Sequence, residues 1–111
     1  MNLLDSRRRL VERFGRTMAL SRPLTTASSA VVTLLGVVSA FAPTQIGQGD
    51  IRQGDLQVAI LADEIAASLW PGPPRPRDSL SIDGVRYAVQ GVQPLFDGVT
   101  CIGFTLWVRG G

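Results

Sequence analysis

The sequence of 111 residues lacks lysine and histidine altogether, and its 11 basic side chains are all arginine. Histidine is the commonest general base and the commonest metal ligand in proteins. The single cysteine, Cys101, excludes an internal disulfide and a zinc site built from several thiolates. Because most catalytic arrangements of a small enzyme need one of these groups, we expect a protein that is not an enzyme and that uses no metal or other cofactor.

A large charge of one sign is also missing, since the formal net charge is +2. So small a charge steers a protein only weakly toward nucleic acid. A bias toward GC-rich codons is the main explanation for the exclusive use of arginine, although arginine also makes the better bidentate contacts at interfaces. The composition therefore does not indicate nucleic-acid binding as the main function.

No apolar run is long enough to cross a membrane. The longest, residues 30–42, is interrupted by two polar residues and a glycine, and it falls short of the roughly 20 residues that a spanning helix needs. The three arginines at positions 7–9 are not followed by the apolar segment of a secretory signal. We therefore expect a protein that does not associate with a membrane and that is made and used in the cytoplasm.

The composition is that of a folded protein, with 45% hydrophobic and 18% charged residues. The length suits one domain over residues 1–111, with an N-terminal helix (1–15) and a β-barrel (17–109). Residues 42–55 are expected to form a long flexible loop within that barrel.

Residues 2–15 are predicted to form the N-terminal helix. Asn2 is a suitable N-cap, Gly15 provides a stop, and apolar side chains recur between them at helical spacing: Leu3, Leu4, Leu10, Val11 and Phe14. A helix with so narrow an apolar stripe either folds back on its own domain or docks on a partner. We slightly favour the partner, and the candidate docking residues are Arg7, Arg8, Arg9 and Arg13.

The chain beyond the helix follows strand patterns. An alternating run at 18–20, a β-branched segment at 30–41 and an apolar run at 56–61 are each typical of a strand. Gly36 predicts a bend or bulge in the second of them. Residues 62–69 are expected to form a short helical turn.

Two Asp-Gly pairs predict tight hairpins in the second half of the chain. The first, at 83–84, separates the runs 80–82 and 85–89, and the second, at 97–98, precedes the final run 100–109. About five to seven strands result. The predicted fold class is mainly β: a small antiparallel β-barrel with an N-terminal helix, one short inserted helical turn and a long Gly/Gln-rich loop. A β-sandwich is the alternative.

The segment 42–55 is the most unusual part of the chain, because a loop this long in a small domain is either functional or disordered. Its two Gly-Asp pairs lack the ligand spacing of a calcium loop and the Lys-Ser or Lys-Thr ending of a phosphate loop. We interpret it as a polar contact segment. The candidate residues for a channel or a neighbouring subunit are Gln45, Gln48, Asp50, Arg52, Gln53 and Asp55.

The order and spacing of several motifs resemble the head-tail connector proteins of long-tailed phages and of phage-like gene transfer particles. The motifs are Asp55-Leu-Gln-Val-Ala-Ile-Leu, Asp63-Glu-Ile-Ala-Ala-Ser-Leu-Trp-Pro, Pro73-Pro74, Asp78, Ile82-Asp-Gly, Tyr87-Ala-Val, Val92 and Leu106-Trp-Val-Arg-Gly. The resemblance covers roughly residues 1–111. Arg77-Asp78 departs from it, since Gly-Asp is expected at that turn.

The resemblance implies a stopper or head-completion protein, built as a small β-barrel that forms a homo-oligomeric ring of six-fold or twelve-fold symmetry in the virion neck. Such a ring surrounds packaged double-stranded DNA without sequence specificity and retains it. It binds the portal and adaptor ring on one side and the tail terminator or tail tube on the other. We expect loop 42–55 to line or close the channel, or to reach a neighbour, so that excision of residues 47–53 leaves a folded monomer that fails in assembly.

Two alternatives stay open. Another neck or tail ring protein, an adaptor or a tail terminator, has a similar size, although predominant helix would be expected of an adaptor. A small barrel that binds single-stranded nucleic acid on Trp70 and Trp107 is the alternative from a different class. It requires a contiguous basic groove around the aromatic side chains and an affinity that falls steeply with salt.

Overall fold

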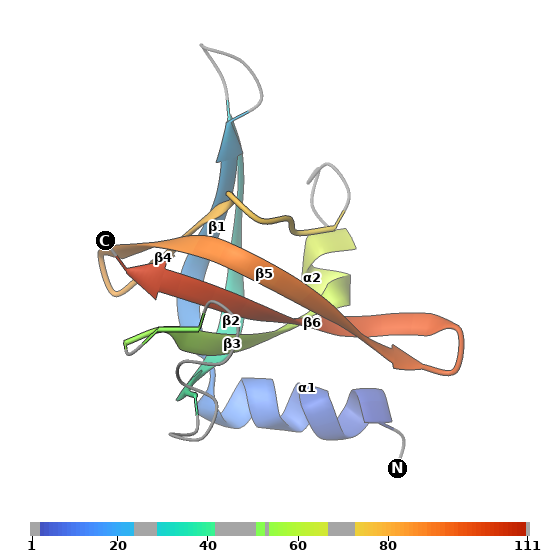
Figure 1. The fold of residues 1–111 in the computed structure, drawn as a ribbon. Helices are drawn as coiled ribbons and strands as arrows, with labels where there is room; N and C mark the ends of the chain where they lie inside the picture. Colours follow the sequence, from blue (N-terminus) through green and yellow to red (C-terminus); the bar gives the residue numbers. More distant parts are fainter. Residues whose placement is uncertain (1–2, 24–28, 42–50, 53, 67–72, 111) are drawn as a thin grey trace.

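The computed structural model describes residues 3–23, 29–41, 51–52, 54–66 and 73–110. Within these ranges six antiparallel strands close into a barrel in the order β1-β2-β3-β6-β5-β4 (Figure 1). They are β1 (Arg16–Pro23), β2 (Ser29–Ala40), β3 (Leu56–Leu61), β4 (Ser79–Ile82), β5 (Val85–Asp97) and β6 (Thr100–Gly110). The predicted fold class is confirmed, and the sandwich alternative is wrong because β4 pairs with β1 and closes the sheet.

The barrel consists of two three-stranded meanders. Strands β1, β2 and β3 pair in sequence order, as do β4, β5 and β6. The meanders join along two seams, β3 with β6 and β1 with β4. Pairing of consecutive strands follows from short connections, which bring sequence neighbours together in space.

Aliphatic side chains from alternate strand positions fill the inside of the barrel. Val58 and Ile60 of β3 are fully buried, as are Leu106 and Val108 of β6. The other strand residues of the core are Met18, Leu20, Val32, Leu34, Leu80, Ile82, Val89 and Phe104. A strand points successive side chains to opposite faces, so the apolar alternation of the sequence becomes a packed interior. A barrel of this strand number has room inside for side chains only.

Gly36 lies inside the barrel, where β2 changes partner from β1 to β3. A Cβ atom at this position would lie 2.7 Å from the sulfur of Met18 and 2.9 Å from a methyl carbon of Val58. Glycine therefore makes room for two core side chains. The pairing of β2 runs through Gly36 without a register shift, so the bulge predicted there is absent; the register shifts lie in β5 instead.

The two predicted Asp-Gly hairpins form with different turns. Asp83 and Gly84 have φ angles of 51° and 81°, the two left-handed residues of a type I′ turn. In the second hairpin Asp97 still belongs to β5, and the turn begins at Gly98, with a φ of 64°. The second turn therefore lies one residue later than predicted, with glycine at the first turn position as a type II′ turn requires.

Two helices flank the barrel. α1 (Leu3–Phe14) lies alongside β2 and β3, below them in Figure 1, and α2 (Ala62–Ala66) directly follows β3. The N–H of Gly15 donates to the carbonyl of Val11 at 2.8 Å where α1 ends. In the described part of the chain neither helix is long and apolar enough to span a membrane.

Candidate functional site

Two turns with the same pattern, Arg-x-x-Asp, lead into strands β3 and β4. We call residues 52–55 the β3 turn and residues 75–78 the β4 turn. In each, the N–H of the aspartate donates to the carbonyl of the arginine, at 3.1 Å and 3.2 Å. The aspartate carboxylate accepts the N–H of the same arginine, at 2.9 Å and 2.8 Å. Each turn thereby places a buried carboxylate at the start of a strand.

The third residue of each turn has a left-handed backbone. The φ angle is 94° at Gly54 and 78° at Arg77, as at the third position of a type II turn. Glycine adopts this conformation freely, whereas a side chain there costs about 1 kcal/mol or more. The conformation of Arg77 thus agrees with the Gly-Asp that the resemblance to phage connectors led us to expect at this turn.

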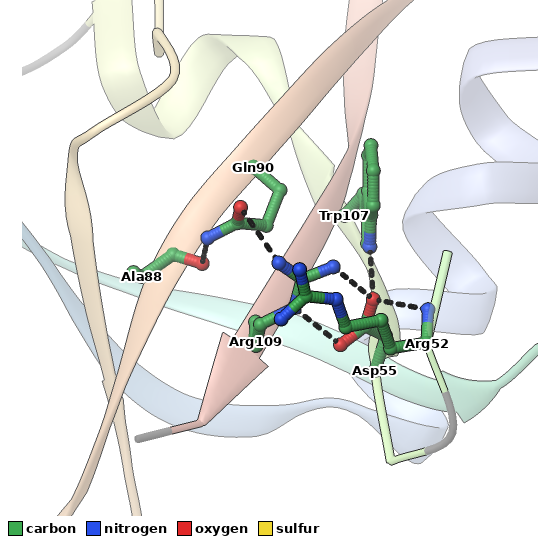
Figure 2. Close-up of polar contacts among 6 residues, drawn as sticks. All are labelled: Arg52, Asp55, Ala88, Gln90, Trp107 and Arg109. Atoms are coloured by element: carbon green, nitrogen blue, oxygen red, sulfur yellow. Dashed lines mark hydrogen bonds and ion pairs between the residues drawn. The ribbon is translucent and has the colours of Figure 1, made fainter. Parts of the chain in front are cut away.

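Asp55 of the β3 turn binds three partners with its carboxylate (Figure 2). The Arg109 guanidinium donates to both oxygens, each at 3.0 Å. The indole N–H of Trp107 donates at 2.8 Å, and the N–H of Arg52 closes the turn on the same oxygen. Arg109 also reaches the amide oxygen of Gln90 at 3.4 Å. These contacts tie the end of segment 42–55 to the last strand of the barrel.

The surroundings of Asp55 favour its ionised form. The hydrogen bonds from Arg109, the Arg52 N–H and the Trp107 indole, of which that from Arg109 has the largest effect, together lower the pKa of this carboxyl to about 2 against the opposing effect of burial. Asp55 is only 4% exposed. Asp55 is therefore charged over the whole physiological range and acts as a fixed anchor.

Asp78 of the β4 turn forms a second buried ion pair, with Arg22 of β1. Both oxygens of Asp78 accept from the Arg22 guanidinium, each at 2.7 Å. Arg22 also donates to the carbonyl of Pro73 at 2.9 Å, and its hydrogen bond to Asp78 raises the pKa of Arg22. The pair ties the chain entering β4 to the first strand of the barrel.

The structure describes only part of the predicted loop site. Arg52 is exposed, whereas Asp55 is buried with partners in its own chain, so its burial does not fit the predicted contact with a channel or neighbour. The sequence analysis did not predict this anchor; the alternation of Trp107 and Arg109 on the outer face of β6 is the sequence pattern that could have indicated it. The other candidates lie outside the described residues: Gln45, Gln48, Asp50 and Gln53. That the loop lines a channel or reaches a neighbour stays a prediction.

Two of the four candidate docking arginines of α1 hold the helix on its own barrel. Arg7 donates to the main-chain carbonyl of Ile60 at 3.0 Å and to that of Phe104, and burial lowers the pKa of Arg7. Arg8 forms an ion pair with Asp63 of α2. The helix therefore folds back on its own domain, and the expected preference for docking by these two side chains is not supported by their contacts.

The opposite side of α1 remains exposed. We call Arg9, Leu10, Arg13 and Phe14 the outer face of α1; Leu10 is 43% and Phe14 is 59% exposed. The Arg13 guanidinium lies over the Phe14 ring, 5.4 Å from its centroid. Arg9 and Arg13 are the docking candidates that the fold leaves available at the surface, and their contact with a partner stays a prediction.

The far end of the β5–β6 hairpin projects beyond the barrel (Figure 1). β3 pairs with β6 only as far as Gly103, and β4 pairs with β5 only as far as Ala88. We call residues 94–101 the arm. Phe96 is 52% and Val99 is 98% exposed on it, so the arm presents large apolar side chains to solvent.

An apolar groove of about 460 Å³ lies beside the arm. We call it the arm groove; its lining residues are Pro73, Pro74, Pro76, Val92, Pro94, Phe96, Cys101 and Phe104. Cys101 is a free, half-buried thiol. The lining offers hydrophobic contact rather than converging polar groups, which is typical of a surface for another polypeptide rather than of a catalytic pocket.

Several side chains of types that are often catalytic or ligand-binding in other proteins make structural contacts in the described residues. Asp63 and Glu64 point to different partners, since Glu64 accepts the N–H of Leu35 at 2.9 Å and Asp63 binds Arg8. Trp107 lies beside the Asp55 carboxylate rather than in a basic groove, and Trp70 lies outside the described residues. The described part of the chain holds no group of three or more potential metal ligands.

Comparison with known proteins gives one family. A family model described as phage head-tail attachment protein matches residues 1–106. The matched range includes α1, both Arg-x-x-Asp turns and the arm. No curated protein matches the chain.

Proposed function

Since the chain belongs to the family of phage head-tail attachment proteins, we propose that copies of it form a ring in the neck of the virion. The ring docks on the portal and adaptor complex, retains packaged DNA and provides the surface to which the tail attaches. The observation that carries the proposal is the family match over residues 1–106. A purely structural role fits a chain without histidine.

The packed interior of the barrel supports a ring. Leu20, Ile60 and Leu106 are fully buried at its centre, so double-stranded DNA cannot pass through a single subunit. A channel for DNA then has to lie between several copies. Closed rings of identical subunits are the ordinary way in which small proteins enclose such a space.

The β3 turn supports a contact role for loop 42–55. Functional loops are commonly held at their ends by a rigid scaffold. Asp55 supplies such a hold, since it is buried and bound by Arg109 and Trp107. The loop is thus fixed where it enters β3, whatever its polar residues contact.

The alternative functions receive less support. A strand-rich barrel with two short helices does not favour an adaptor, and a tail terminator would belong to the same neck assembly. For a barrel that binds single-stranded nucleic acid, Trp107 and Arg109 would have to face the ligand, but both bind Asp55. The buried carboxylate offsets the positive charge that such a ligand needs.

Deletion of the gene in the producing phage tests the proposal. Negative-stain electron microscopy of the lysate should show separate tails beside tailless heads, many of them emptied, and the wild-type gene supplied in trans should restore joined particles. Intact particles in the deletion lysate would contradict a role in the neck.

Excision of part of the loop tests its contact role. The predicted excision of residues 47–53 would remove Arg52, whose N–H and carbonyl both bind Asp55. We therefore shorten it to residues 47–50 and expect a monomer with wild-type unfolding free energy that fails to join heads to tails. Loss of folding would show that the excised residues belong to the fold, and normal particles would show that they make no required contact; either result would contradict the prediction.

A further inference from the structure

Among the residues that the structure describes, two apolar surfaces, the outer face of α1 and the arm with its groove, remain exposed to solvent. We propose that the outer face of α1 of one copy docks in the arm groove of the next copy. The inference rests on the proposed ring and goes further, because it names the two surfaces that meet at the contact between subunits.

The two surfaces match in size and in apolar character. Leu10 and Phe14 are spaced i,i+4 and form one row on the helix, beside the row of Arg9 and Arg13. A helix that presents an i,i+4 apolar pair is suited to an apolar groove. The arm groove, at about 460 Å³, has the size of pockets that enclose drug-sized ligands, so it can take both side chains.

The charges around the two surfaces are complementary. Asp97, exposed at the tip of the arm, can pair with Arg9 or Arg13 of the helix. Arg75, exposed between two prolines that line the groove, can pair with the exposed Glu12 of α1. Such pairs at the rim contribute little affinity but fix the orientation of partners.

The arm is suited to side-chain contacts rather than to strand addition. Pro94 provides no N–H for a neighbouring strand, and the register of β5 shifts between Leu95 and Phe96. Both features hinder pairing of one arm with the edge of another. A helix that packs against Phe96 and Val99 requires no free backbone groups.

The two surfaces lie at different ends of α1. Cys101 lines both the arm groove and a second hollow that it shares with Leu4, in the first turn of α1. Phe14 is ten residues further along, about 15 Å of helix. Contact between two different surfaces of identical chains is heterologous, and heterologous contacts build rings when the rotation closes.

A zero-length cross-link tests the contact. In particles carrying Phe14→Cys, mild oxidation should join the new thiol to the native Cys101 of the next copy and give a ladder of dimers, trimers and higher species on a non-reducing gel. A disulfide within one chain is out of reach across the length of α1, because its Cα atoms must approach within about 7 Å. Arg13→Cys keeps both apolar anchors and serves if Phe14→Cys does not assemble.

Two controls identify the surfaces. The ladder should vanish in Phe14→Cys combined with Cys101→Ser, and it should be absent in Val85→Cys, a thiol at an equally exposed apolar position on the turn side of β5. Monomers only, a ladder from Val85→Cys, or a link to a different neck protein would each overturn the inference and leave the proposed function intact. Absence of the protein from purified particles would overturn the proposed function as well.

Discussion

The β3 turn and the β4 turn share one design but differ in two details. Each is an Arg-x-x-Asp turn whose aspartate is buried at the start of a strand and paired with an arginine from another strand. In the β3 turn the third residue is Gly54, and the partner Arg109 is 23% exposed. In the β4 turn the third residue is Arg77, and the partner Arg22 is only 6% exposed.

The difference shows how one ion pair can have two roles. A buried arginine that loses its carboxylate has no water to replace it, whereas a partly exposed arginine can be hydrated. We therefore expect the β4 turn to be part of the fold itself and the β3 turn to act chiefly as the fixed end of loop 42–55.

Removal of the buried carboxylate of the β4 turn should have the largest effect. Asp78→Ala leaves the guanidinium of Arg22 buried without its partner, so we expect the free energy of unfolding to fall by about 3 to 5 kcal/mol. Urea denaturation followed by circular dichroism measures the change. The control is Arg16→Ala, which breaks the exposed pair with Asp83 at 3.3 Å without changing the left-handed turn residue, and it should cost less than about 1 kcal/mol. Equal losses of unfolding free energy in both variants would show that burial does not decide how much an ion pair contributes to stability.

The β3 turn should respond less strongly, and its response should depend on pH. The pKa of Asp55, about 2, lies below its ordinary value of 3.8, so the ionised carboxylate stabilises the folded state by about 2 kcal/mol above pH 4. This contribution is lost as the pH falls from about 4 through 2, because the unfolded state takes up the proton first and is thereby stabilised relative to the folded state. The difference in unfolding free energy between the wild type and Asp55→Asn should be constant from pH 5 to 7 and shrink toward pH 2.

A difference that persists undiminished at pH 2 would contradict this account of Asp55. It would mean that the shape of the side chain, rather than its charge, holds the turn. Arg109→Gln provides the matching test from the other partner, since it keeps a hydrogen-bond donor but removes the charge. It should abolish most of the same pH dependence.

The sequence predicted the barrel because its signals are local. Alternating apolar residues and the Asp-Gly pairs are read within a few positions, and they indicated strands, hairpins and helices close to those observed. The choice between a closed barrel and a sandwich depended on whether β1 pairs with β4, and no local sequence pattern specifies that pairing. Of the bend or bulge expected at Gly36, the bulge is absent, because the glycine is required there for close packing against Met18 and Val58.

The site was harder to predict, because its partners are distant in sequence. Asp55 and Arg109 are 54 residues apart, and only the pairing of β3 with β6 brings them together. Arg7 binds main-chain carbonyls, which every residue has and which therefore leave no pattern in the sequence. The sequence alone could not tell that Arg7 packs against the barrel while Arg9 is exposed. The N-terminal helix was thus predicted correctly as an element, whereas its docking on a partner through the outer face stays a prediction.

The smallest change in unfolding free energy should come from substitutions at the third residue of each turn. Arg77→Gly relieves a left-handed φ of 78° at an exposed side chain, and we expect a gain of about 0.5 to 1 kcal/mol after the added flexibility of the unfolded chain is subtracted. Gly54→Ala should cost about 1 kcal/mol from backbone strain alone, because a Cβ at Gly54 meets no atom within 4 Å. Arg75→Gly, the control in the same turn, should not stabilise the protein. If Arg77→Gly lowers the unfolding free energy, the Arg77 side chain makes a contact whose stabilisation exceeds the cost of its left-handed backbone. Arg77 would then contribute to the protein rather than be a residue that the β4 turn merely tolerates in place of glycine.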